Sequence, residues 1–139
     1  MAWKNEAAIN AYYEGQQAPI QAEMDNAQAA YEAAVKRLKE QKAAEDAAAY
    51  RSYMRQQIEL PGIMRAQGNH GGMVDSAVAG VMNKYNQGRA NRSTQLNADL
   101  ANQELQNVQN QNSLRAKLAA LKQQAEAERL SLKGSRYVP

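Results

Sequence analysis

The sequence contains no cysteine, no phenylalanine and only one histidine, and these absences exclude several classes of site. Without cysteine the chain has no disulfide framework, no zinc-thiolate site and no thiol nucleophile. A single histidine, His70, cannot form a histidine-based metal site. The carboxylates show no opposed pair that would support general acid-base chemistry. We therefore expect a protein that is not an enzyme, with no catalytic residue, no cofactor and no metal.

Large apolar residues are also scarce. Leu, Ile and Val together number 20 of 139 residues, below the roughly 20% that is typical of packed domains. A disordered chain would usually add high net charge and many prolines, but this one has a net charge of +3 and 3 Pro. Abundant Ala, Gln and Asn with few β-branched residues predict long, thinly packed helices.

Long apolar runs are missing as well. No stretch approaches the roughly 20 apolar residues that are needed to cross a bilayer, so we expect no membrane span. The first residues turn polar within five positions and lack the apolar region of a secretory signal. A soluble protein is the expectation.

Glycine and proline mark two breaks in an otherwise helical pattern. The minor break is Gly15–Pro19, and the major one runs from Leu60 to Gly72. We predict an all-α, coiled-coil-like helical hairpin that forms a single elongated unit over residues 1–139. Its parts would be a short N-terminal helix (3–14), a long helix (20–59), a loop (60–72) and a second long helix (73–133) closed by Gly134. Folding back at the loop would lay residues 3–14 beside residues 118–130.

Apolar residues recur at steps of seven, four and three, as on one packing face of a helix. Counting by sevens also places Asn107 on this face. In that middle stretch a solvated surface and a polar layer that fixes register both remain open. The predicted packing and oligomer seam consists of Met24, Tyr31, Val35, Leu38, Val78, Tyr85, Leu100, Asn107, Leu114, Leu118 and Leu121.

A two-helix hairpin leaves half of each helix facing water, and this chain has few side chains to bury. We therefore expect a homo-oligomer that is held together by copies of itself or by a larger assembly. His70, in the glycine-rich loop, is predicted to be an exposed turn residue or a contact for a partner.

The charges are unevenly distributed. Residues 1–60 carry a net charge of −2 and residues 61–139 carry +5. Lys84, Arg89 and Arg92 lie within about two turns of Tyr85, which would suit phosphate contacts and base stacking. A solvated face, or pairing with the acidic first half, is the favoured interpretation, so nucleic acid is a possible but not a preferred partner.

The loop and the following helix carry one short motif. Gln67-Gly68-Asn69-His70-Gly71-Gly72-Met73-Val74-Asp75-Ser76, followed nine residues on by Tyr85, resembles small helical proteins encoded by phages and prophages of Gram-positive bacteria. The likeness covers residues 57–95, with Asp75 where those proteins are expected to have Glu. It implies a structural protein of the virion, in a tail, neck or fibre complex, that is assembled in the host cytoplasm and contacts other virion proteins. The alternative is a DNA-associated ejection or scaffolding protein with a basic C-terminal half.

Overall fold

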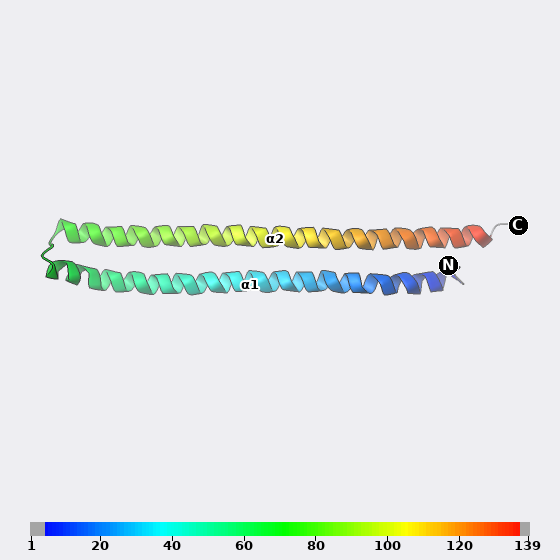
Figure 1. The fold of residues 1–139 in the computed structure, drawn as a ribbon, viewed down its shortest axis with the longest axis horizontal. Coiled ribbons are helices and arrows are strands. Elements are labelled where there is room, and N and C mark those ends of the chain that lie inside the picture. Colours follow the sequence, from blue (N-terminus) through cyan, green and yellow to red (C-terminus); the bar gives the residue numbers. More distant parts are fainter. Residues whose placement is uncertain (1–4, 137–139) are drawn as a thin grey trace. The chain divides into compact units, whose positions relative to one another are not determined.

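The computed structural model describes residues 5–136, and these form two helices, α1 (Glu6–Ala66) and α2 (Gly72–Arg136) (Figure 1). The described part of the chain contains no strand, and the two helices pack against each other. The predicted all-α helical hairpin is therefore confirmed.

The contacts of the chain group it into two compact units rather than the single unit that the sequence led us to expect. Unit 1 comprises Met1–Ala33 with Gln103–Pro139, and unit 2 comprises Ala34–Asn102. Each unit takes one segment from α1 and one from α2.

The two segments are antiparallel within each unit. In unit 1, Arg129 Nε donates to Asn10 Oδ1 at 2.8 Å, and Asn107 Nδ2 donates to Gln28 Oε1 at 3.0 Å. In unit 2, Arg92 Nε donates to Asp46 Oδ1 at 2.6 Å. In unit 1, residues later in α1 pair with residues earlier in α2. The start of α1 therefore lies beside the end of α2, as we predict from folding the chain back at the loop.

Burial along both helices repeats every eleven residues. On α1 one series of half-buried or buried positions runs Ile9, Ile20, Tyr31, Lys42, Tyr53 and Met64, and on α2 the matching series runs Val74, Tyr85, Leu96, Asn107, Leu118 and Arg129. Eleven residues make three turns at about 3.67 residues per turn, close to the 3.6 of an unstrained α-helix. The seven-residue steps that predict the seam agree with this eleven-residue pattern only over short stretches of each helix.

The proline breaks do not interrupt α1, which corrects the predicted short helix over 3–14 and the predicted start of the loop at Leu60. Helical conformation continues through Gly15, Pro19 and Pro61 and ends at Ala66. An interior proline costs about 3 kcal/mol because it removes a backbone hydrogen bond and its ring crowds the preceding turn. Half-buried residues flank both prolines, and we attribute the continuity of the helix to their packing on α2.

The connection between the helices is therefore short, and glycine geometry defines it. Gly68 has φ +89°, its N–H bonds to Arg65 O at 3.0 Å, and the N–H of Asn69 bonds to Met64 O at 2.9 Å. This is a Schellman cap, which requires the left-handed conformation that glycine adopts without strain. Gly71, with φ +62°, accepts the first hydrogen bonds of α2 from Val74 and Asp75.

The opposite ends of the helices meet in unit 1. Ile9, Tyr13 and Ala125 form a buried cluster against which Leu121 and Leu132 pack. Asn5 caps the start of α1, because its Oδ1 accepts a hydrogen bond from the N–H of Ala8 at 2.9 Å. The predicted end of the second helix at residue 133, closed by Gly134, is corrected to Arg136. Gly134 does not close the helix, because among the described glycines only Gly68 and Gly71 have positive φ.

Candidate functional site

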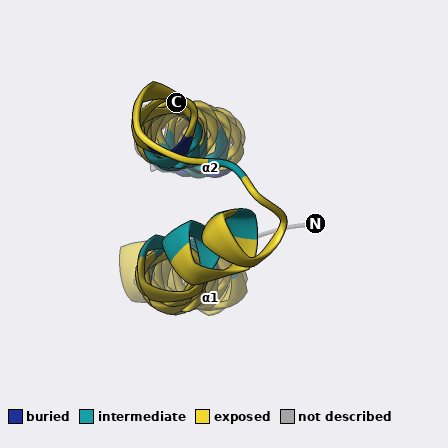
Figure 2. Ribbon diagram, turned by 90° about the vertical axis from the view of Figure 1, so that its left-hand side faces the viewer, coloured by how far each residue is buried: buried dark blue, intermediate teal, exposed yellow. Residues whose placement is uncertain are grey.

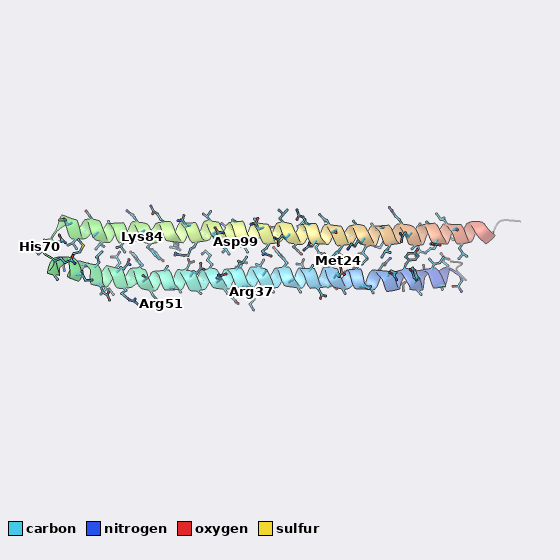
Figure 3. The ribbon with its side chains drawn as sticks, viewed as in Figure 1. Met24, Arg37, Arg51, His70, Lys84 and Asp99 are labelled. Carbon is cyan, nitrogen blue, oxygen red and sulfur yellow. The ribbon has the colours of Figure 1, made fainter. Side chains whose placement is uncertain are left out.

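The predicted seam residues lie between the two helices of one chain. All eleven are half-buried or buried, and Figure 2 shows this class of residue on the facing sides of α1 and α2, with exposed residues outside. Met24 lies on the inner side of α1, whereas Arg37 and Arg51 lie on its outer side (Figure 3). These seam side chains therefore pack between the two helices of the hairpin.

Several buried residues are absent from the seam that we predict from the sequence. Ile9 and Tyr13 are buried although they fall in the segment predicted as a separate helix, and Gln111 is buried as well. Val74 and Ala125, which the apolar spacing places on the packing face, are buried as that spacing predicts. A period of eleven finds Ile9, because it stands one whole repeat before Ile20 on the same face of α1. The heptad steps used on the sequence drift off this face within a few turns.

Unit 1 contains a polar layer in its seam. Asn107 Nδ2 donates to Gln28 Oε1 at 3.0 Å, and Gln111 Nε2 donates to the backbone carbonyl of Met24 at 2.9 Å. Gln111 is 8% exposed. The polar middle of α2 therefore lies partly between the helices, and its amides bond across the seam. Such bonds favour one register, because sliding the helices would leave the buried amides unpaired.

Unit 2 contains an ionic layer between its two segments. Asp46 accepts a hydrogen bond from Lys42 Nζ at 2.7 Å on its own helix and another from Arg92 Nε at 2.6 Å on α2. The bonds from Lys42 and Arg92 hold the pKa of Asp46 below its usual 3.8. A surface groove of about 360 Å³ lies beside this layer, lined by Lys42, Glu45, Arg92 and Asp99 among others.

Three tyrosines form an aromatic cluster in unit 2. The rings of Tyr53 and Tyr85 stack with centroids 4.4 Å apart, and Tyr50 meets Tyr85 edge-on at 6.3 Å. Tyr85 and Arg92 are two of the four residues that would suit nucleic acid. In the structure Tyr53 covers one face of the Tyr85 ring, and Asp46 binds the Arg92 guanidinium. Lys84 and Arg89 lie on exposed positions of α2.

The described residues gather no cluster of the kind that holds a metal ion. Within residues 5–136 no three histidine, aspartate or glutamate side chains come together as a metal site would require. His70 is exposed in the connection between the helices (Figure 3). Burial raises the pKa of the Tyr13 phenol, and the charge of Glu128 raises it further. Neither described helix has a segment both long and apolar enough to span a bilayer.

Large apolar side chains on the outer sides of the helices are the remaining candidates for function. Unlike the seam residues, they are exposed, although Tyr50 also meets Tyr85 of α2 edge-on. In the described part of the chain the exposed ones are Tyr12, Tyr50, Met54, Ile58, Ile63, Met73, Met82, Leu105, Val108 and Leu130. Ile58 at 75% and Met73 at 64% are the most exposed of them. Their chemistry is that of helix association.

Comparison of the chain with protein-family models, with curated proteins and with solved structures gives no match.

Proposed function

We propose that this chain is a non-catalytic structural protein that acts by assembling with copies of itself. One observation carries the proposal: the balance of buried and exposed apolar side chains. Five apolar residues of the described range are buried, and two of these are Ala125 and the partly polar Tyr13, whereas ten large ones are exposed. Full burial of a large apolar side chain gains about 1.5–3 kcal/mol. These side chains are 38–75% exposed, so each gains only a part of that against a neighbour, and the ten together favour association.

The place of this assembly, in our proposal, is a bacteriophage virion, in a tail, neck or fibre complex with other virion proteins. The support is the motif around the connection, Gln67–Ser76 with Tyr85, which resembles small helical proteins of phages and prophages. Two glycines of that motif are required by the backbone conformation, since Gly68 ends α1 and Gly71 accepts the first hydrogen bonds of α2. The assembly would form in the host cytoplasm.

A DNA-associated ejection or scaffolding role is the second candidate, because positive charge gathers in one unit. Unit 2 carries ten basic and six acidic residues, whereas unit 1 carries seven basic and eight acidic ones. A net charge of this sign attracts phosphate. The first candidate is favoured because Lys42 and Arg92 already bind Asp46.

Light scattering coupled to size exclusion, together with DNA binding at several salt concentrations, tests both roles. For a structural protein we expect a mass that is a multiple of 15.3 kDa and no DNA binding at about 150 mM salt. Binding to duplex DNA that weakens by about tenfold or more between 50 and 200 mM salt would favour the second role. A monomer that ignores DNA would contradict both.

A further inference from the structure

The outer flank of unit 2 differs from that of unit 1 at positions that the repeat makes equivalent. In unit 1 one groove is lined by Gln21, Asp25 and Gln28 from α1 and by Arg115 from α2, among others. Because eleven residues make three whole turns, positions that differ by multiples of eleven project from the helix in the same direction. The equivalents in unit 2 are therefore residues on the same flank of its seam.

Those equivalents are apolar. At one shift of 33 residues, Met54 corresponds to Gln21, Ile58 to Asp25 and Met82 to Arg115, and Tyr50 corresponds to Gln17, which lies one turn before Gln21. Their exposed fractions are 51% for Tyr50, 38% for Met54, 75% for Ile58 and 43% for Met82. We call these four residues the Met54 patch. Four polar positions in one unit have thus become four large apolar ones in the other, so this flank is specialised for a contact.

We infer that the Met54 patch binds the same patch of a second copy of this chain, an inference that rests on the proposed self-assembly. Tyr50, Met54 and Ile58 are spaced four residues apart, so they form one stripe on α1 that is symmetric about Met54. Across a twofold axis at Met54, antiparallel α1 helices place Tyr50 opposite Ile58 of the second copy and Met54 opposite Met54. An interface of this kind is self-complementary.

The exposed area supports a second copy as the occupant. The chain exposes 10023 Å² of surface, whereas a compact protein of 15.3 kDa exposes about 7,100 Å². The excess, about 2,900 Å², is larger than the 1,200–2,000 Å² that a stable interface buries in total. A dimer can therefore form without exhausting the exposed surface of either copy.

The residue types of the patch fit the centre of a protein interface. Tyrosine and methionine are enriched there, and acidic groups and lysine are depleted. Tyr50 is already held in place by its edge-on contact with Tyr85, so it loses little freedom on binding. Apolar side chains of this kind do not recognise phosphate, and this argues against nucleic acid as the occupant of this flank.

Glutamate substitutions test the patch. We expect the wild type to show twice the 15.3 kDa monomer mass, or a larger even multiple, by light scattering at about 100 μM. Met54→Glu combined with Ile58→Glu should halve that mass or raise the dissociation constant at least about tenfold, because two carboxylates per chain would lose their water. Gln21→Glu, at the equivalent position in unit 1, is the matched control and should leave the mass unchanged.

Single cysteines give a second, independent measurement, because the chain contains no cysteine of its own. Under oxidised glutathione, Met54→Cys should form a disulfide between copies at least about tenfold faster than Gln21→Cys, because only the former meets its own equivalent across the axis. If the double glutamate variant loses helicity by circular dichroism, the disulfide rates decide the question.

The outcomes separate this inference from the proposed function. A wild-type monomer at about 100 μM would overturn both the self-assembly and the patch. An oligomer that survives the double glutamate substitution, with Met54→Cys reacting no faster than Gln21→Cys, would overturn the patch alone and leave self-assembly standing. Loss of the oligomer together with rapid disulfide formation at Met54 would support both.

Discussion

Asp46 accepts hydrogen bonds from cations on both helices, and its protonation state therefore affects the pairing of the helices. Lys42 and Arg92 stabilise the carboxylate form, so the folded-state pKa lies below 3.8. A carboxyl group whose pKa falls on folding stabilises the folded state at every pH above its unfolded-state pKa. That stabilisation is lost as the pH falls through the folded-state pKa.

We predict that Asp46→Asn lowers stability at pH 7 and that this difference vanishes in acid. Chemical unfolding of both proteins, followed by circular dichroism from pH 7 to pH 2, measures it. The difference should stay constant down to about pH 4 and then disappear, because the protonated wild type also lacks a charge for Arg92. Asp25→Asn is the matched control, since exposed Asp25 receives only one hydrogen bond, from Gln21 at 3.5 Å. An equally large effect at Asp25 would contradict the prediction.

The sequence could not reveal the partner of Arg92. Arg92 lies near Lys84, Arg89 and Tyr85 along the chain, where we favoured a solvated face or pairing with the acidic first half over phosphate contacts, but without a named partner. The Asp46 carboxylate is 46 residues away, and the two meet only because the helices pair in one register. Asn107 was easier to place, because counting by sevens from Leu114 reaches the seam before the heptad and eleven-residue patterns diverge.

At the scale of the element, the ends of the helices depend on backbone conformation more than on composition. Pro61 and Gly62 both lie inside α1, and the helix stops only where Gly68 can adopt φ +89°. Composition predicts a loop anywhere in the glycine-rich stretch. The bonds of the Schellman cap select Gly68. The long loop expected from Leu60 onward therefore shrinks to the five residues between the helices.

We predict opposite effects for two glycine-to-alanine substitutions. Gly68→Ala should destabilise the protein by about 1–2 kcal/mol, because an alanine side chain is strained in the left-handed conformation. Gly80→Ala should stabilise it by about 0.5–1 kcal/mol, because Gly80 lies inside α2 and nothing lies within 4 Å of an added Cβ. Denaturant unfolding at one fixed protein concentration measures both. Equal effects at the two sites would contradict the helix end assigned to Gly68.

At the scale of the whole molecule, the small buried core links stability to the proposed self-assembly. If folding is coupled to association, a higher protein concentration favours the folded state by mass action.

We predict that the midpoint of thermal unfolding rises by about 3 to 6 °C for each tenfold increase in concentration, since tenfold is worth about 1.4 kcal/mol. Melting curves over two decades of concentration measure this shift. The Met54→Glu and Ile58→Glu double variant should show a smaller dependence, whereas Gln21→Glu should behave as the wild type. A midpoint that is independent of concentration in the wild type would indicate a chain that is stable alone.

The eleven-residue period of burial has a consequence for changes in length. Adding or removing one whole period at facing points of α1 and α2, for example residues 42–52 together with 86–96, returns every remaining side chain to its original orientation. Insertions of four or seven residues would instead rotate one half of a helix against its partner. A chain lengthened or shortened in paired steps of eleven would therefore keep its seam, so we expect such a variant to fold into a hairpin of a different length.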